Sequence, residues 1–112
     1  MSLMKMINRF MRILVLFDLP VTTKRARKHY MNFRKFLIKD GYDMLQYSVY
    51  CRVVRNHDDS KKHITRLKTN LPPQGSVRVM LVTEKQYSSM EILVGTKTAS
   101  ENFLCPEELL EV

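Results

Sequence analysis

The chain has 112 residues, of which 45% are hydrophobic and 27% charged, so it is long enough for one globular domain with a modest core. Nineteen lysines and arginines against eleven acidic residues give a net charge of +8, which favours a polyanionic partner such as nucleic acid. No apolar run reaches the roughly 18 residues of a membrane span, and Cys51 and Cys105 lack both metal-ligand spacing and the number needed for a disulfide-stapled fold, so we expect a cytoplasmic protein.

The first predicted element is a strand over residues 11–18, after a leader over residues 1–10 that begins with a possible expression scar. The strand is apolar on both faces, as expected for a strand buried on both sides. It ends at Asp18, and Pro20 stops it. Acidic residues that cleave phosphodiesters usually act through Mg²⁺, and two copies of Asp18 across a dimer could share one ion. The alternative is a polar strand end that bonds the following turn.

A helix is predicted next, with Thr22 or Thr23 as its N-cap and Gly41 at its exit. Apolar residues recur on one face at helical spacing, namely Ala26, Tyr30, Phe33 and Leu37. The opposite face is basic and includes Lys24, Arg25, Arg27, Lys28 and Arg34. Basic side chains in a first turn oppose the helix dipole by a few tenths of a kcal/mol each, a cost that a phosphate backbone would offset.

Two strands, over residues 43–46 and 48–54, are predicted on either side of a tight bend near Tyr47. A second helix begins at Asn56 or Asp58 and ends before Pro72-Pro73. Its expected buried positions are Ile64, Leu67 and Leu71, and its candidate nucleic-acid contacts are Lys61, Lys62 and Arg66. We interpret the three histidines, His29, His57 and His63, as solvated side chains. Strands over residues 75–83 and 90–94 complete the pattern.

This order predicts an α+β, ferredoxin-like βαββαβ domain over residues 11–95, with two helices on one sheet face and an extra C-terminal strand. The other face, which includes Leu14, Leu16 and Met80, is apolar and expected to stay exposed in one copy. A symmetric homodimer would cover it, and the extra strand would add to the partner's sheet edge. Residues 96–112 form an acidic tail.

The two basic helices of each copy would form an extended footprint that suits the backbone of a nucleic-acid duplex. No aromatic residues are interleaved with the basic ones, so the pattern does not predict stacking on single strands. No nucleophilic triad, glycine-rich phosphate loop or zinc cluster is present in the sequence.

Three motifs carry a family resemblance. They are Phe17-Asp18-Leu19-Pro20, Gln46-Tyr47-Ser48-Val49-Tyr50 and Thr83-Glu84-Lys85-Gln86-Tyr87. In this order and spacing they closely resemble the small CRISPR-associated adaptation protein, the second of the two Cas proteins shared by nearly all CRISPR systems. The Phe-Asp-Leu-Pro form and the acidic tail are similar to the version found beside single-protein effector (type II) nucleases.

The resemblance implies a homodimeric, metal-dependent endonuclease that acts on RNA or DNA, with Asp18 as the catalytic residue and Mg²⁺ ligand. It also implies a partnership with the larger CRISPR integrase, in which this protein bridges two integrase dimers on double-stranded spacer DNA. Single-stranded RNA is a second candidate ligand. Arg25 and Arg27 match the arginines that the family often has after its first strand. The alternative function is a structural DNA-binding adaptor that needs no chemistry, and a small-ligand sensor on the same fold is a third.

Overall fold

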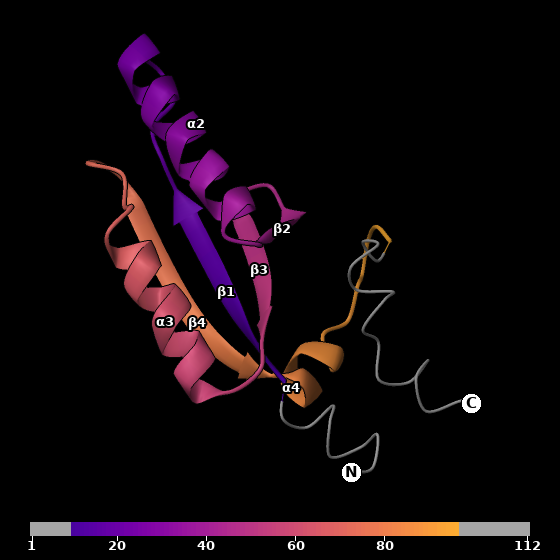
Figure 1. Cartoon of the computed structure of the whole chain (residues 1–112). Helices are drawn as coiled ribbons and strands as arrows, with labels where there is room; N and C mark the ends of the chain where they lie inside the picture. Colours follow the sequence, from indigo (N-terminus) through magenta and orange to yellow (C-terminus); the bar gives the residue numbers. More distant parts are fainter. Residues whose placement is uncertain (1–9, 97–112) are drawn as a thin grey trace.

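Four strands form one antiparallel sheet in the computed structural model, which describes residues 10–96 (Figure 1). β1 (Met11–Asp18) lies inside the sheet and pairs with β3 (Val49–Val54) on one edge and with β4 (Ser76–Thr83) on the other. β2 (Asp43–Gln46) pairs with β3, which gives the order β2-β3-β1-β4. The predicted α+β, ferredoxin-like fold is confirmed. The predicted strand over 48–54 begins one residue later because Ser48 belongs to the turn.

Two helices, α2 (Lys24–Lys39) and α3 (His57–Lys68), lie on the same face of this sheet (Figure 1). Both begin at predicted caps, since the Thr23 hydroxyl accepts the backbone N–H of Ala26 at 3.0 Å and Asn56 accepts that of Asp59 at 2.8 Å. Within the described residues, neither these helices nor any other is both long and apolar enough to cross a membrane. Residues 1–9 of the predicted leader and residues 97–112 of the predicted acidic tail lie outside the part of the chain described here.

The core lies between the sheet and the two helices. Ile13, Val15 and Phe17 alternate along β1 and face the helices, where they pack with Phe33 of α2 and other buried side chains. The ring of Phe17 meets that of Phe33 edge to face, with centroids 5.3 Å apart. The prediction that Leu71 is buried is wrong, because α3 ends at Lys68 and Leu71 is exposed in the loop that follows.

A short helix that the sequence analysis did not predict, α4 (Glu84–Ser88), follows β4 directly. It begins with a capping box, in which Thr83 Oγ1 accepts the N–H of Gln86 at 3.0 Å and Gln86 Oε1 accepts the N–H of Thr83 at 2.9 Å. The predicted extra C-terminal strand over residues 90–94 is not present in the described chain. A strand needs a hydrogen-bonded neighbour, and within residues 10–96 this segment pairs with neither edge strand of the sheet, β2 or β4.

The open face of the sheet carries a buried ion pair between Arg12 of β1 and Glu84 of α4. Arg12 Nε and Nη2 donate to the two carboxylate oxygens of Glu84 at 2.8 and 3.0 Å, and both side chains are at most 4% exposed. The guanidinium also lies 3.9 Å from the ring centroid of Tyr87. Burial alone would lower the pKa of Arg12, but the hydrogen bonds and charge of Glu84 raise it. This pair fastens α4 to β1.

Tyr87 packs with Leu14 and Cys51 in a second small cluster on this open face. The expectation that Leu14 stays exposed is therefore wrong, because α4 was not predicted and supplies the ring that covers it. Leu16 and Met80 do remain 37% and 51% exposed. The uncovered apolar area is thus smaller than predicted and lies beside the middle of β1, where Met80 is opposite Leu14.

We expect Glu84→Ala to lower the free energy of unfolding by about 3–5 kcal/mol, because it leaves the Arg12 charge buried without a counter-charge. Urea unfolding followed by circular dichroism measures this change. The matched control replaces both partners, Arg12→Met with Glu84→Leu, and should be far less destabilising. A single variant as stable as the unmodified chain would show that the pair does not hold α4.

Candidate functional site

Asp18, the predicted catalytic residue and metal ligand, is exposed at the carboxyl end of β1 opposite Ser76 of β4. Gly75 lies against this strand end, with a φ of 100° that favours glycine. A Cβ added at Gly75 would lie only 2.7 Å from the carbonyl oxygen of Asp18 and from Leu19 Cδ2. The loop before β4 therefore packs directly on the residues that present the Asp18 carboxylate.

Asp18 does not belong to a cluster of candidate metal ligands in the part of the chain that the structure describes. Within residues 10–96 there is no group of three or more His, Cys, Asp or Glu side chains that could hold an ion. An exposed carboxylate nevertheless has the hard oxygen that Mg²⁺ prefers, and Mg²⁺ usually keeps several waters and takes only one or two carboxylates. The residues present thus fit half of a magnesium site, which two copies of the chain could complete.

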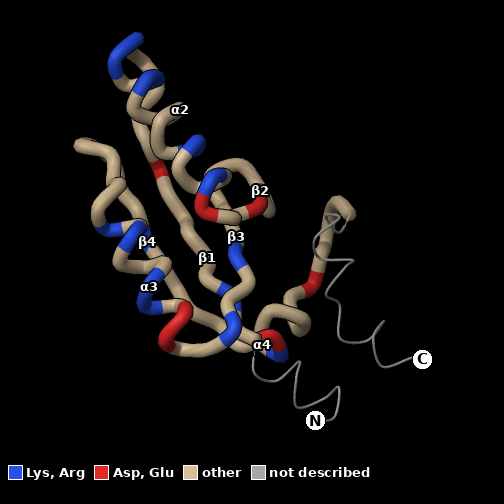
Figure 2. The backbone as a smooth tube through the Cα atoms, viewed as in Figure 1, with Lys and Arg blue, Asp and Glu red and all other residues tan. Residues whose placement is uncertain are grey.

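The first turns of α2 carry four of the basic residues that we predict to bind nucleic acid. The first turn has no acidic residue to offset them, and all four basic side chains are exposed, namely Lys24, Arg25, Arg27 and Lys28. Arg27 Nη1 donates to the carbonyl oxygen of Val21 at 3.1 Å, which orients its guanidinium beside the loop from β1. These positions are the basic end of α2 in Figure 2.

A cavity of about 370 Å³ lies between this end of α2 and the loop before β4. Arg25 and His29 of the helix line one side, and Pro73 and Gln74 of the loop line the other. Gln74 precedes Gly75, the residue that packs on Asp18. The cavity therefore opens close to the carboxyl end of β1, and the structure brings the basic turns of α2 to the same end of the sheet as Asp18.

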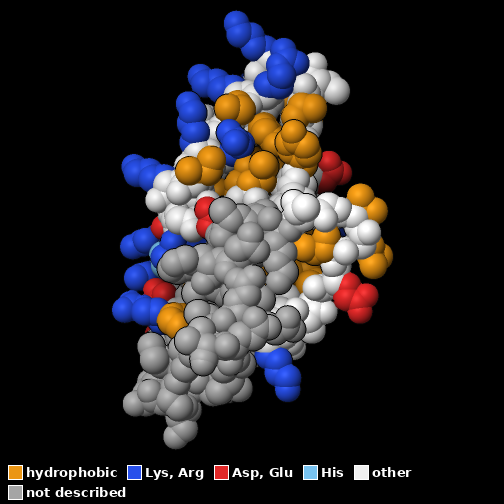
Figure 3. Space-filling model, turned by 90° about the vertical axis from the view of Figure 1, so that its right-hand side faces the viewer, with side chains coloured by type: hydrophobic (Ala, Val, Ile, Leu, Met, Phe, Trp, Pro, Cys, Tyr) orange, Lys and Arg blue, Asp and Glu red, His pale blue; other side chains and the backbone are white. Residues whose placement is uncertain are grey.

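The basic residues predicted on α3 are exposed, but two of them form ion pairs with carboxylates of the same chain. Lys62 Nζ lies 3.3 Å from Asp59 Oδ1, and Arg66 Nη1 lies 3.0 Å from Asp40 Oδ1. In the space-filling view, Lys and Arg side chains run down one edge of the molecule from the top, where α2 begins (Figure 3). Lys61 is exposed on the same helix. The exposed basic side chains of the two helices thus form one extended positive face, although part of its charge on α3 is paired within the chain.

Arg34, which we predict to contact nucleic acid, also supports the core. Its Nε donates to the hydroxyl of Tyr50 at 2.9 Å, and it is half-buried. Tyr50 is buried and stacks on Phe17, with ring centroids 5.7 Å apart. A buried hydroxyl needs a partner, so the Arg34 side chain holds Tyr50 and, through it, the residue that precedes Asp18.

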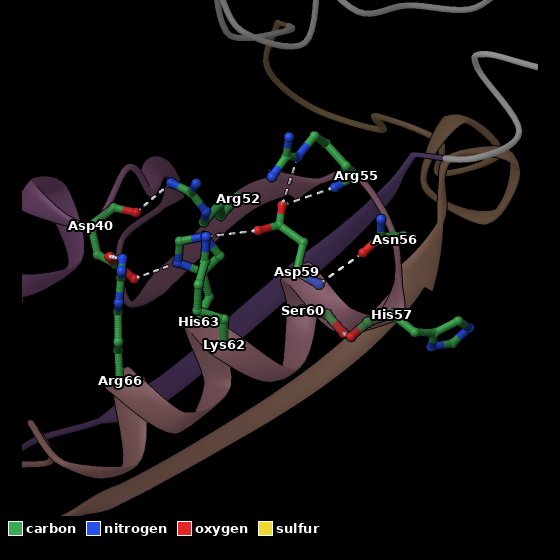
Figure 4. Close-up of polar contacts among 10 residues, drawn as sticks. All are labelled: Asp40, Arg52, Arg55, Asn56, His57, Asp59, Ser60, Lys62, His63 and Arg66. Carbon is green, nitrogen blue, oxygen red and sulfur yellow. Dashed lines mark hydrogen bonds and ion pairs between the residues drawn. The ribbon is translucent and has the colours of Figure 1, made fainter.

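The prediction that His63 is a solvated side chain is wrong, since it is buried between two carboxylates (Figure 4). His63 Nδ1 donates to Asp40 Oδ2 at 2.9 Å, and Nε2 lies 3.5 Å from Asp59 Oδ1. Arg52 Nη1 donates to the carbonyl oxygen of Asp40 from the sheet. This cluster joins α3, the end of α2 and β3. Because Asp40 is 23 positions from His63, no local spacing in the sequence indicates it.

The charges of this cluster depend on its hydrogen bonds. Burial alone would raise the pKa of Asp40, but the hydrogen bonds from His63 and Arg66 outweigh burial and lower that pKa below its ordinary 3.8. The hydrogen bond from the backbone N–H of Arg55 lowers the pKa of Asp59. Both carboxylates are therefore held ionised beside His63, and the cluster stabilises the helix layer that carries the positive face.

Comparisons with known proteins agree on one family. Residues 11–90 match the family model described as CRISPR associated protein Cas2. The CRISPR-associated endoribonuclease Cas2 of Acidovorax ebreus is 58% identical over 85 residues, which cover 76% of this chain and 83% of that protein. The protein of the same name from Treponema denticola is 48% identical over 85 residues, 76% of this chain and 84% of that protein. A crystal structure of Streptococcus pyogenes Cas2 at pH 6.5 shares the fold, with a TM-score of 0.57, 23% identity and coverage of 74% of this chain and 99% of that one.

We expect acid to weaken the link between α3 and the end of α2. The lowered pKa of Asp40 means that its ionised form stabilises the fold above pH 3.8, and this contribution is lost as the pH falls through the lowered value. Urea unfolding at several pH values should therefore show a smaller decline below pH 3.8 for Asp40→Asn than for the unmodified chain. Asp43→Asn, at an exposed position of β2, is the matched control. Identical pH profiles for the unmodified chain and Asp40→Asn would contradict this role.

Proposed function

Because the chain belongs to the CRISPR associated protein Cas2 family, we propose that it is a metal-dependent endonuclease of the CRISPR spacer-acquisition machinery that hydrolyses phosphodiester bonds in RNA or DNA. Its relatives in Acidovorax ebreus and Treponema denticola are named endoribonucleases, which supports RNA as a substrate. The single observation that carries the proposal is the exposed carboxylate of Asp18 at the end of β1, at the same end of the sheet as the basic first turns of α2.

Asp18 is the proposed magnesium ligand, with one carboxylate from each of two copies. When bound, Mg²⁺ supplies Lewis-acid stabilisation of the negative charge that develops on the phosphate during hydrolysis. The chain's own part is to hold the carboxylate in place. The pairing of β1 with β4 fixes the strand end, and the close approach of Gly75 prevents the backbone of Asp18 from moving toward the loop.

Arg25 and Arg27 are the proposed phosphate-binding residues. Arg25 lines the cavity beside the loop that packs on Asp18, and Arg27 is oriented by its hydrogen bond to Val21. Guanidinium groups bind phosphate oxygens through paired N–H donors. Since the first turn of α2 has no acidic residue, the positive end of the helix dipole adds to their attraction for phosphate.

A homodimer would bring the two Asp18 carboxylates together. The exposed Leu16 and Met80 form an apolar area on the open face, which supports contact with a second copy there. Residues 90–94 are also exposed, including Leu93 and Val94. We propose that this segment pairs with a sheet edge of the partner and forms there the strand that the isolated chain lacks.

The positive helix face also supports a second function, that of a structural adaptor. Exposed basic side chains spread over both α2 and α3 offer more positive surface than a single cleavage site needs. Such a surface suits the regularly spaced phosphates of a DNA duplex. In this function the protein would hold double-stranded spacer DNA and bridge the larger CRISPR integrase without any cleavage.

Asp18→Asn should abolish Mg²⁺-dependent cleavage of RNA and DNA, because it removes the charge and keeps the size of the side chain. Gel analysis of labelled single strands and duplexes measures cleavage. Urea unfolding, duplex affinity and the sedimentation of a dimer should stay unchanged. Cleavage that persists with the same Mg²⁺ dependence would contradict the proposed site. Spacer acquisition that persists in cells while cleavage is lost would assign the biological role to the adaptor.

Arg25→Ala and Arg27→Ala should each reduce the dependence of duplex affinity on salt by about one counterion per lost phosphate contact. Fluorescence anisotropy over a series of salt concentrations gives this slope. Arg66→Ala is the matched control, because Arg66 is paired with Asp40, and it should lower stability more than it lowers the slope. Equal slope reductions for all three variants would place the footprint across α3 as much as α2.

A further inference from the structure

Tyr47, at the tip of the turn between β2 and β3, is an exposed aromatic side chain that neither the core nor the proposed mechanism uses. It is 86% exposed and is the one aromatic residue among the exposed large hydrophobic side chains of residues 10–96. An isolated apolar residue on a surface needs no explanation. A tyrosine at the tip of a tight turn does need one, because turns favour small or polar residues there.

The turn holds Tyr47 beside the end of β1 that carries Asp18. The backbone N–H of Phe17 donates to the carbonyl oxygen of Ser48 at 3.0 Å, and Leu16 lies opposite Val49 in the sheet register. The residues next to Asp18 and next to Tyr47 are thus joined by a direct backbone hydrogen bond. Tyr47 and Asp18 therefore lie at the same end of the sheet, on segments that are 29 positions apart in the sequence.

The backbone of this turn is strained, and its surroundings are rigid. Ser48 has a φ of 65°, in the left-handed region that glycine adopts at less cost. On the β3 side, Tyr50 is buried, stacked on Phe17 and bonded to Arg34. A strained residue persists where the surrounding structure fixes it, and such residues cluster at functional sites. The backbone of the turn is therefore held in place, and the aromatic ring of Tyr47 faces outward from it.

We propose that Tyr47 is a stacking platform for an unpaired nucleobase of the strand whose phosphate lies at Asp18. An exposed ring on a rigid turn offers a flat face to a base, and aromatic stacking accepts every base because each has a π face. Bases inside a duplex are already stacked and paired, so the ring selects a nucleotide that is single-stranded or extruded from the helix. The inference rests on the proposed function for the identity of the ligand as nucleic acid, but not on cleavage.

The first test uses Tyr47→Trp. The chain contains no tryptophan, so the variant has a single indole whose fluorescence reports on its own surroundings. A short single-stranded RNA, added without Mg²⁺ so that it is not cut, should quench this fluorescence. The same sequence in a fully paired duplex should bind without quenching. Equal quenching by both, or none with bound single strand, would overturn the proposal.

The second test separates stacking from simple apolar contact. Tyr47→Ala and Tyr47→Leu should both weaken the affinity for the single strand by about tenfold, the size expected for one lost base stack, and leave duplex affinity unchanged. Tyr47→Phe keeps the ring and should bind like the unmodified chain. If Tyr47→Leu binds as well as the unmodified chain, the contact is not stacking and the proposal is wrong.

Two further readouts separate this proposal from its alternatives. Sedimentation of Tyr47→Ala should match that of the unmodified chain, since a variant that loses a dimer would assign Tyr47 to an interface between copies and overturn the proposal. Asp18→Asn should still bind the single strand. Adding Tyr47→Ala to Asp18→Asn should lower that affinity as much as Tyr47→Ala lowers it in the unmodified chain. If the unmodified chain stacks a base on Tyr47 but cleaves no strand, the proposed nuclease is wrong and the role of Tyr47 is supported. If the chain cleaves but Tyr47 does not stack, the role of Tyr47 is wrong and the nuclease is supported.

Discussion

The position of β1 inside the sheet is the constraint on which the rest of this structure depends. The strand is bonded to β3 along one edge and to β4 along the other, so its register is set from both sides. A slip of one residue would turn Ile13 and Val15 out of the core and move Arg12 into it. The same register that buries the core therefore also places Asp18 opposite Ser76 and beside the turn at Ser48. The register of β1 therefore determines both the packing of the core and the position of Asp18.

Local patterns were sufficient to predict most of the fold. The caps Thr23 and Asn56 define the starts of α2 and α3, because a side chain that accepts a nearby backbone N–H acts within one turn. Alternating and two-sided apolar runs predicted the four strands of the sheet. α4 was missed although its capping box, Thr83 with Gln86, is also a local signal. The strand predicted over residues 90–94 was wrong for a different reason. A strand forms only against a neighbouring strand, and the local sequence does not show whether one is present.

The candidate site was predictable only in part, because some roles come from contacts between distant segments. Asp18 and the basic turns of α2 are close in sequence, and both were identified. Arg34 is a charged residue on a basic helix face, which is typical of a solvent-exposed side chain. Because Tyr50 packs against Phe17 in the core, its buried hydroxyl needs a partner, and Arg34 supplies it. His63 looked solvated because its helix face is basic, whereas Asp40 meets it from the end of another helix. In both cases the tertiary fold, not the residue type, decides the role.

The Arg12–Glu84 pair also has a consequence for how the chain is made. The two residues are 72 positions apart, so a ribosome releases β1 long before the counter-charge of Arg12 exists. An apolar strand without charge is the kind of segment that aggregates when it is exposed. We therefore expect Arg12 to act as a gatekeeper that keeps the nascent strand soluble until α4 supplies Glu84 as its counter-charge. One side chain would then protect the incomplete chain and pair with Glu84 in the finished one.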